Sequence, residues 1–257
     1  MVPVRLLWLV LVLFIQHGKA NESPNAELSN RPHVVVLVAE REYETQQSLK
    51  RFSEDREEAY RFTVVAADPN DRNRLIGLDS LQNADLMLVS VRRRTLPAEQ
   101  LALIRDFISQ GKPVVGIRTA SHAFSLRNKK PPEGRTDWQD FDQVVFGGNY
   151  TNHYGNDLQV KLIFTDTGSK HPIVKGIDEN RKYFSSGSLY RVSPLMQRTK
   201  VLMRGQVKGH PAEPIAWTYR RADGGKSFYT SLGTTDDFQG LLLPELLENA
   251  LLWGLGK

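Results

Sequence analysis

Residues 33–39, His-Val-Val-Val-Leu-Val-Ala, form a short run that is apolar and mostly β-branched after its first residue. This pattern is typical of a strand buried on both faces of a parallel sheet. Similar runs follow at residues 62–66, 85–90 and 113–117. Between them, apolar residues recur at helical spacing over residues 45–60 and 97–110. Strands that alternate with helices in this way predict βαβ crossovers and a parallel, doubly wound sheet.

The composition agrees with a folded domain and excludes several kinds of chemistry. The chain has 257 residues, 40% hydrophobic and 25% charged, which is enough for one domain with a real core. Its net charge of +5 is interspersed with acidic residues, so no nucleic-acid groove is indicated. There is no cysteine. This excludes disulfides, thiolate zinc sites, iron–sulfur clusters and a cysteine nucleophile.

The N-terminus has the form of a secretory signal peptide over residues 1–20. Arg5 precedes an apolar run over residues 6–15, and the segment ends at Ala20 with small residues near it. The run is about half of the roughly 20 residues that a membrane-spanning helix needs, so we expect cleavage after Ala20 and no stable membrane anchor. Residues 21–31 are polar and predict a disordered lead-in before a folded domain over residues 32–257. The expected location is periplasmic or secreted.

The rhythm of the sequence changes after residue 117. Two loops are expected, at residues 125–135 and 147–156, with a short helix at 138–145 between them. Long loops in a compact domain are usually functional or disordered, and we expect these two to form the rim of a site. Further strands are expected at residues 158–164, 199–203, 214–220 and 227–232, followed by a closing helix at 241–255.

Candidate site residues follow the strands, because ligands of an open parallel sheet bind beyond the carboxyl ends of its strands. They lie after the first strand, after the fourth strand, after the last strand and in the loop at 147–156. The candidates are Glu40, Glu42 and Tyr43; Arg118, Ser121 and His122; Thr234; and Tyr150, Asn152 and His153. We interpret the charge run Arg92–Arg94 as a solvated rim. Because His171 precedes a proline, we expect it to have a structural role. We expect His210 to lie on the surface.

The segment over residues 111–123 predicts a buried strand that ends in Gly-Ile and turns sharply into small residues. This shape resembles the elbow that holds the nucleophile in class I glutamine amidotransferases. Arg118 stands at the elbow position, and the chain has neither a thiol nor a Gly-x-Ser-x-Gly motif. Glutaminase chemistry is therefore excluded. The alternative to a functional elbow is an ordinary tight turn between strand and helix.

Several segments occur in the order found in the trehalose-utilisation (ThuA-like) family, which this chain resembles from about residue 33 to the C-terminus. They are Gly-Ile-Arg-Thr-Ala-Ser-His-Ala-Phe (116–124), Phe-Gly-Gly-Asn-Tyr-Thr-Asn-His (146–153), His-Pro-Ile-Val-Lys-Gly (171–176), Ser-Leu-Tyr (188–190), Pro-Ile-Ala-Trp (214–217) and Phe-Tyr-Thr-Ser-Leu-Gly (228–233). The resemblance implies an α/β fold: a flavodoxin-like three-layer sandwich with a mostly parallel central sheet, as in class I glutamine amidotransferases but without their cysteine. It also implies a link to sugar catabolism and, in some relatives, a metal at the strand ends.

The sequence departs from the family pattern at two positions. Thr234 follows Gly233 where a histidine is common, and Arg118 replaces the usual histidine of the elbow. The resemblance therefore does not supply a three-residue catalytic relay. It leaves His122, one helical turn beyond the elbow, as the histidine nearest to that position.

We expect His122 and His153 to converge on one pocket, with Arg118, Asn152 and one of Glu40 or Glu42 around them. A neutral imidazole acts as a base near pH 7 or ligates a divalent metal. Two histidines and a carboxylate would suit zinc, but the fixed charge of Arg118 opposes a divalent ion. No metal ligand is therefore assigned, and the cofactor remains open. The expected catalytic residues are His122, His153 and Arg118, and the expected substrate-binding residues are Glu42, Tyr43, Ser121, Tyr150, Asn152 and Thr234.

Two classes of function fit these observations. The first is a secreted or periplasmic enzyme of carbohydrate catabolism that acts on a glycoside or 3-keto-sugar by acid–base or metal-assisted chemistry. The second is a non-catalytic carbohydrate-binding module that kept the pocket of the fold. Either takes a small-molecule carbohydrate as its partner and no nucleic acid.

Overall fold

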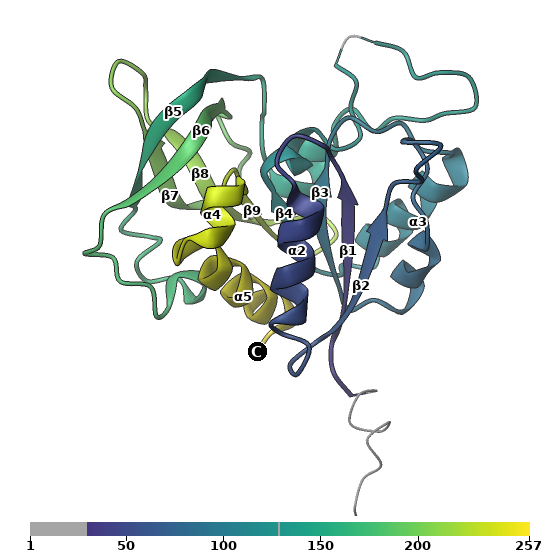
Figure 1. Ribbon diagram of the computed structural model, residues 1–257, viewed down its shortest axis with the longest axis horizontal. Helices are drawn as coiled ribbons and strands as arrows, with labels where there is room; N and C mark the ends of the chain where they lie inside the picture. Colours follow the sequence, from purple (N-terminus) through teal and green to yellow (C-terminus); the bar gives the residue numbers. More distant parts are fainter. Residues whose placement is uncertain (1–29, 128) are drawn as a thin grey trace, which may run out of the picture. The chain divides into compact units, whose positions relative to one another are not determined.

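One nine-stranded sheet runs through the described residues, 30–127 and 129–257, of the computed structural model (Figure 1). The expected signal peptide, and the lead-in up to residue 29, lie outside the described residues. Residues Pro32–Lys257 form one compact unit. In the described part of the chain, no helix is long and apolar enough to cross a membrane.

The elements lie in the following order along the chain. The strands are β1 (His33–Ala39), β2 (Arg61–Ala66), β3 (Leu86–Val91), β4 (Val114–Ile117), β5 (Asn152–Phe164), β6 (Tyr183–Arg191), β7 (Thr199–Gln206), β8 (Glu213–Arg220) and β9 (Lys226–Thr230). The α-helices are α2 (Thr45–Glu54), α3 (Ala98–Ser109), α4 (Thr235–Gln239) and α5 (Leu242–Leu255). The shorter helical segments are η1 (Leu78–Asn83), η2 (Arg118–His122), η3 (Asp142–Phe146) and η4 (Pro172–Val174).

The first half of the sheet is parallel. Its strands lie in the order β2-β1-β3-β4-β9, and each neighbouring pair in this half is parallel. The expected strands in residues 33–117 are therefore confirmed. Because the strands are parallel, their carboxyl ends meet at one edge of the sheet, and the residues that follow β1, β3, β4 and β9 are brought to that edge.

The other half of the sheet is antiparallel, which corrects the expectation of a mostly parallel sheet. The order continues as β9-β8-β7-β5-β6, and four of the eight pairings among the described strands are antiparallel. The connections explain this. Parallel neighbours need a crossover of a dozen or more residues, whereas only residues 221–225 join β8 to β9 and 207–212 join β7 to β8. The flavodoxin-like description therefore does not hold for the sheet as a whole.

Two hydrophobic clusters lie on the two faces of the sheet. Alternate residues of β1 point to opposite faces, so Val35 and Leu37 belong to one cluster, and Val34 and Val36 to the other. Helix α3 covers the first face, and α2 and α5 cover the second (Figure 1). All residues of β1 are buried. Burial of each large aliphatic side chain stabilises the folded state by roughly 1.5–3 kcal/mol. The strand ends at the carboxyl edge of the sheet are therefore held in place by a well-packed core.

Several boundaries differ from the expectation. Helix α2 ends at Glu54 rather than at residue 60, and α3 begins at Ala98 and ends at Ser109. The expected loop at 147–156 is a loop only in its first part, because β5 begins at Asn152 and pairs with β6. Strand β6 was not expected, since its Ser-Ser-Gly centre interrupts the apolar pattern and its burial is partial.

Candidate functional site

A sharp turn joins β4 to η2, and Arg118 lies at its centre. The φ angle of Arg118 is 43°, in the left-handed region that costs a non-glycine residue roughly 1–2 kcal/mol. The carbonyl oxygen of Arg118 accepts a 2.6 Å hydrogen bond from the buried hydroxyl of Tyr229. This bond, together with the packing of β4, holds the strained turn. The sharp turn that the sequence predicted after the buried strand is therefore present in the structure.

The guanidinium of Arg118 is buried, with 3% of the residue exposed, and the nearby charge of Asp237 favours its protonated form. Its Nη1 donates to the Ser231 carbonyl oxygen at 2.9 Å, and its Nη2 donates to Ser188 Oγ at 3.3 Å. The guanidinium carbon lies 4.2 Å from the ring centre of Tyr43 and 5.2 Å from that of Tyr190. The Nε atom is buried without a hydrogen-bond partner. In the described part of the chain, no carboxylate forms an ion pair with Arg118.

His122 lies at the end of η2 and is also buried. Its Nδ1 lies 3.1 Å from Ser121 Oγ, and its ring stacks on Tyr150 with centroids 4.4 Å apart. Burial lowers the pKa of His122 well below its usual value, and four nearby positive charges lower it further. These belong to Arg93, Arg92, Arg127 and Arg118. The imidazole is therefore neutral at pH 7 and able to accept a proton.

A cavity of about 370 Å³ lies beside the turn, and we name it the elbow cavity. It draws residues from the ends of β1, β3 and β4 and from β5 and β6, as the carboxyl-edge expectation requires. Both His122 and His153 line it, and the Tyr190 ring lies 6.0 Å from the first and 6.4 Å from the second, between centroids. The full lining is Glu42, Tyr43, Arg92, Arg118, His122, Tyr150, His153, Asn156, Ser188 and Tyr190.

His153 lies on β5 and has one ring nitrogen fixed. Its Nδ1 lies 2.8 Å from the carbonyl oxygen of Gly155. Because a carbonyl only accepts hydrogen bonds, Nδ1 is the donor, and Nε2 carries the lone pair of the neutral ring. The cavity thus contains two imidazoles, each oriented by a different neighbour.

The two glutamates that follow β1 have different roles in the structure. The carboxylate of Glu40 accepts hydrogen bonds from the backbone amides of Glu42 at 2.7 Å and Thr45 at 3.1 Å. It therefore holds the loop that leads into α2. Glu42 lines the elbow cavity and forms an ion pair with Arg92 at 2.8 Å. Of the two alternatives left open by the sequence, Glu42 is the one in the cavity.

Three of the expected substrate-binding residues do not line the elbow cavity. Asn152 is exposed at the start of β5, opposite Arg191. Ser121 contacts the Nδ1 of His122 and lines a neighbouring hollow. Thr234 caps α4, with its hydroxyl accepting from the Asp237 amide at 3.3 Å.

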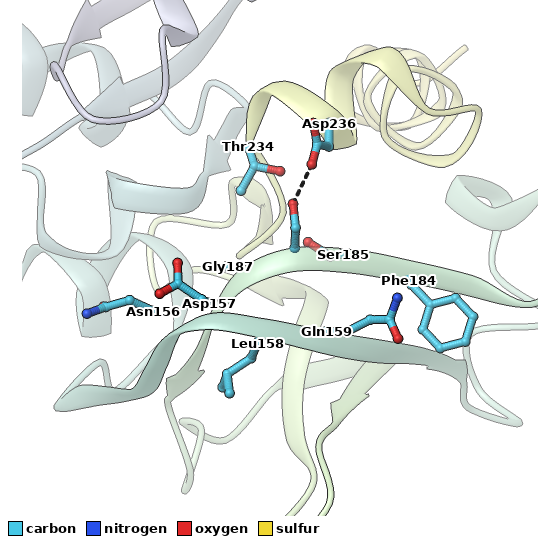
Figure 2. Close-up of a pocket in the computed structure, with 10 residues that line it drawn as sticks. Asn156, Asp157, Leu158, Gln159, Phe184, Ser185, Gly187, Thr234 and Asp236 are labelled. Carbon is cyan, nitrogen blue, oxygen red and sulfur yellow. Dashed lines mark hydrogen bonds between the residues drawn. The ribbon is translucent and has the colours of Figure 1, made fainter.

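Two further hollows adjoin the elbow cavity. The arginine pocket, of about 630 Å³, shares His122 and Tyr150 with it and includes Arg93 and Arg127. The β5–β6 groove, of about 570 Å³, shares Asn156 with it and lies between β5, β6 and α4 (Figure 2). In this groove Ser186 donates to Asp236 at 2.7 Å. The three hollows together offer room for a ligand longer than one sugar ring.

The sequence did not single out Asp142, which lines the arginine pocket. Its Oδ2 accepts a 2.7 Å hydrogen bond from the Tyr150 amide, whereas its buried Oδ1 has no partner. Burial raises the pKa of Asp142 to about 7. Nothing in the local sequence distinguishes this aspartate from a surface residue of a short helix, because its burial depends on the chain returning at Gly148.

The sequence also did not predict that Tyr190 and Arg92 line the cavity, or that Arg94 is buried. Tyr190 belongs to a family-like segment but lies on the strand that the sequence did not predict. Arg92 lines the elbow cavity, and Arg94 is buried with its Nη1 donating to the Arg92 carbonyl oxygen at 2.8 Å. The expectation of a purely solvated rim is therefore wrong for Arg94.

The placement of the expected structural histidines agrees with the sequence interpretation. His171 precedes η4 and its Nδ1 accepts from the Ile173 amide at 3.3 Å. His210 is exposed and stacks on Tyr154. Within residues 30–127 and 129–257, no group of three His, Asp or Glu side chains could hold a metal ion. The residues of the cavity thus do not fit the two-histidine zinc site considered from the sequence.

These features define an α/β protein with a mixed sheet, an amidotransferase-like elbow that carries arginine in place of the nucleophile, and an aromatic, polar cavity at the carboxyl edge. The family model described as trehalose utilisation (ThuA) matches residues 33–254. The chain therefore belongs to the trehalose-utilisation family, and a role in carbohydrate metabolism is what this membership supports.

Solved structures agree at the level of the fold. A ThuA-like protein from Bacteroides uniformis is 14% identical, with a TM-score of 0.64, and the match covers 88% of this chain and 92% of that one. A ThuA-like protein from Parabacteroides merdae is 15% identical, with a TM-score of 0.63, and the match covers 88% and 91%. Among curated proteins, the search gives no match.

Proposed function

We propose that the chain is an enzyme of carbohydrate catabolism that acts on a glycoside or 3-keto-sugar by acid–base chemistry in the elbow cavity. The observation that carries this proposal is His122, a buried and neutral imidazole that lines a cavity with tyrosine rings. Family membership supports the carbohydrate, and the rings of Tyr43, Tyr150 and Tyr190 offer apolar faces to a sugar.

The residues can divide a proton transfer between them. His122 takes a proton from the substrate, such as the hydrogen on a carbon next to a keto group, because its ring lines the cavity and is unprotonated at pH 7. His153, whose Nδ1–H is held by the Gly155 carbonyl oxygen, presents Nε2 as a hydrogen-bond acceptor that positions a hydroxyl of the substrate. Arg118 supplies a fixed positive charge for the negative charge of the reacting molecule. His122 then gives the proton it has taken to the leaving oxygen, so the proton taken and the proton returned balance.

A panel of disaccharides and their 3-keto forms tests the proposal, with turnover and calorimetric binding measured in parallel. We expect turnover of at least one member and a loss of about 100-fold or more in His122→Ala and in His153→Ala. His210→Ala is the matched control, since His210 is exposed and outside the cavity lining. Unchanged turnover and binding in both cavity variants would remove these histidines from the site.

The second candidate is a non-catalytic carbohydrate-binding module. It is favoured by Thr234, which caps α4 where a histidine is common in the family pattern. The same panel separates the two candidates. Binding without turnover of any member supports the module and contradicts the enzyme.

The proposal includes export from the cytoplasm. It rests on the signal-like sequence of residues 1–20, which ends in Ala20. The intact mass of the protein recovered after expression with its own N-terminus tests this. We expect a mature chain that begins at Asn21, and a chain that keeps residues 1–20 would contradict the proposal.

A further inference from the structure

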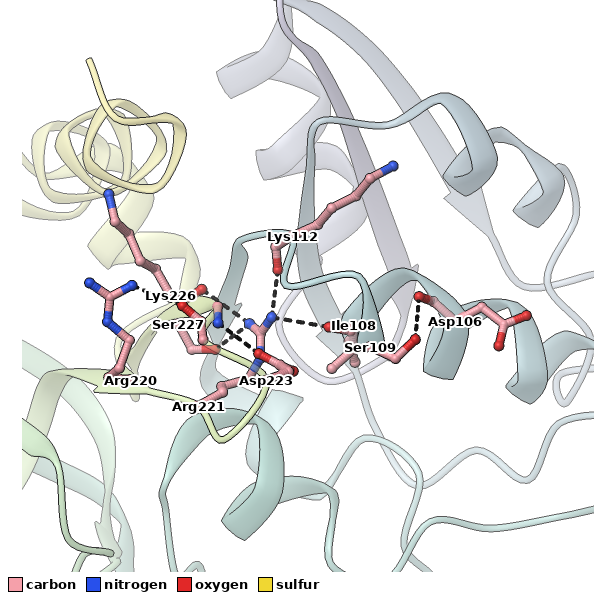
Figure 3. Close-up of polar contacts among 11 residues, drawn as sticks. Asp106, Ile108, Ser109, Lys112, Arg220, Arg221, Asp223, Lys226 and Ser227 are labelled. Atoms are coloured by element: carbon pink, nitrogen blue, oxygen red, sulfur yellow. Dashed lines mark hydrogen bonds and ion pairs between the residues drawn. The ribbon is translucent and has the colours of Figure 1, made fainter.

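Two arginines in the described part of the chain are almost fully buried near β9, and they differ in their hydrogen bonds. Every guanidinium nitrogen of the buried Arg221 donates to at least one acceptor (Figure 3). Its Nε contacts both carboxylate oxygens of Asp223 at 3.0 and 3.1 Å. Its Nη1 donates to the Lys226 carbonyl oxygen at 3.1 Å and Ser227 Oγ at 3.0 Å. Its Nη2 donates to the carbonyl oxygens of Ile108 at 3.3 Å and Lys112 at 2.7 Å. This is the environment of a buried arginine with a structural role.

Arg118 lacks the carboxylate that Arg221 has. Its Nη atoms have neutral acceptors, Ser231 and Ser188, and its Nε has none. A buried charge without a counter-charge is costly, and proteins normally pair such a group. Within residues 30–127 and 129–257, Asp237 acts on Arg118 through its charge, but no carboxylate forms an ion pair with the guanidinium. The cation lines the elbow cavity, so a ligand can supply the negative charge there.

The residues around Arg118 leave part of its guanidinium without a hydrogen-bond acceptor. The guanidinium carbon lies over the rings of Tyr43 and Tyr190, whose faces attract a cation but carry no counter-charge. Gly187 has a φ angle of 116°, and a Cβ there would lie 3.0 Å from Arg118 Nη2. A larger residue at position 187 would therefore crowd the guanidinium, and glycine leaves its Nη2 side clear.

The charged residues that line the elbow cavity itself, Arg92, Arg118 and Glu42, carry one net positive charge, which matches a ligand with a single negative charge. Arg92 is already paired with Glu42 at 2.8 Å, so Arg118 is the cation of the lining without an acidic partner. A planar guanidinium matches the geometry of a carboxylate. The carboxylate of Glu42 lines the same cavity and disfavours a dianion such as a phosphate monoester.

We propose that Arg118 binds the carboxylate of a sugar acid, so that the preferred ligand of the elbow cavity is an aldonate or uronate rather than a neutral sugar. This inference rests on the proposed function to the extent that the cavity takes a carbohydrate. It differs in placing the negative charge on the bound molecule before any reaction begins.

Calorimetric titrations of the full chain with D-gluconate, D-glucuronate, D-glucose and D-glucose 6-phosphate test the inference. We expect one of the two sugar acids to bind at least about tenfold more tightly than glucose, because hydrogen bonds to charged groups are the stronger ones. We also expect it to bind more tightly than the phosphate. Equal binding of acid and neutral sugar, tighter binding of the phosphate, or no binding of either acid would overturn the inference.

Variants assign the effect to Arg118. Arg118→Gln should weaken sugar-acid binding by about 10- to 100-fold and weaken glucose binding by a clearly smaller factor. Arg118→Lys keeps the positive charge, so we expect it to retain part of the preference for sugar acids over glucose. This variant also tests the inference if Arg118→Gln does not fold. The matched control is Arg105→Gln, since Arg105 lies over the ring of Trp138 at 3.8 Å and outside the cavity. An unchanged preference in Arg118→Lys and Arg118→Gln would contradict the assignment.

His122→Gln separates this inference from the proposed function. The substitution removes the base but leaves Arg118, so sugar-acid binding should persist within about threefold while turnover is lost. Retained binding with no turnover in the wild type contradicts the enzyme and supports the carboxylate site. Turnover of neutral sugars that depends on Arg118, without any preference for acids in binding, supports the enzyme and overturns the carboxylate site.

Discussion

At the scale of single residues, burial decides the charge state of the two titratable groups beside Tyr150. His122 stacks on the Tyr150 ring, and Asp142 accepts the hydrogen bond of the Tyr150 amide. Burial disfavours the charged form of each, so it lowers the pKa of the histidine and raises that of the aspartate. Both groups are therefore held nearer to neutrality, in a part of the molecule rich in arginine.

The first prediction concerns His122 and acid stability. The folded pKa of His122 is lowered, so below about pH 6.5 the unfolded chain takes up a proton that the folded chain does not. The free energy of unfolding should thus fall between pH 7 and pH 5, and fall less in His122→Gln. Denaturant unfolding of both proteins across this range measures the difference. Parallel pH curves for the two proteins would contradict the lowered pKa.

The second prediction concerns Asp142 and has the opposite sign. Its pKa of about 7 exceeds the unfolded value, so the folded protein loses stability as pH rises from about 4 to beyond 7. Asp142→Asn keeps an oxygen for the Tyr150 amide and removes the buried charge. It should raise the free energy of unfolding at pH 8 by about 1–3 kcal/mol and change it little at pH 4.5. A variant that is less stable at pH 8 would show that the carboxylate is needed.

At the scale of elements, the hairpin of β8 and β9 joins the two halves of the sheet. Strand β9 pairs in parallel with β4 and antiparallel with β8. Arg221 follows β8 and binds the carbonyl oxygens of Ile108 and Lys112, at the end of α3 and just before β4 (Figure 3). One side chain thus ties the hairpin turn to the neighbouring crossover.

The third prediction follows from this network. Arg221→Ala should lower the free energy of unfolding by about 3–5 kcal/mol, because it leaves a cavity, unpaired carbonyl oxygens and the carboxylate of Asp223. Arg220→Ala is the control, since Arg220 is exposed and its side chain donates to the Gly224 carbonyl oxygen in the same turn. It should change stability by less than about 0.5 kcal/mol. Equal losses in the two variants would argue against the buried network.

Element prediction from the sequence succeeded where local pattern and burial agree. Strand β1 is buried on both faces, so its continuous apolar run is unambiguous. Strand β6 is half-exposed and carries Ser185, Ser186 and Gly187, so its pattern is that of a loop. The antiparallel pairing of the second half depends on which distant strands meet, and no local pattern encodes this.

The candidate site was likewise predicted only in the part that depends on the parallel half of the sheet. The carboxyl-edge rule brought Tyr43, Arg118 and His122 together correctly, because they directly follow strands of the parallel half. Asn152 and Thr234 were placed less well. Asn152 is the first residue of β5, which starts six residues earlier than the strand predicted at 158–164. Thr234 is the N-cap of α4.

At the scale of the whole molecule, the described sheet and both hydrophobic clusters are built from residues 33–257. The fourth prediction is that a chain of residues 32–257 folds with a thermal midpoint within about 3 °C of the chain of residues 21–257. Calorimetric unfolding of both measures this. A much lower midpoint for the shorter chain would show that residues 21–31 stabilise the fold.

The elbow cavity itself is tested most directly by a crystal structure of the protein with the tightest-binding member of the sugar panel. We expect the ligand beside His122 and against the rings of Tyr43 and Tyr190, with its carboxylate at Arg118. A well-ordered ligand bound elsewhere on the molecule, with the elbow cavity free of it, would contradict the assignment of the site.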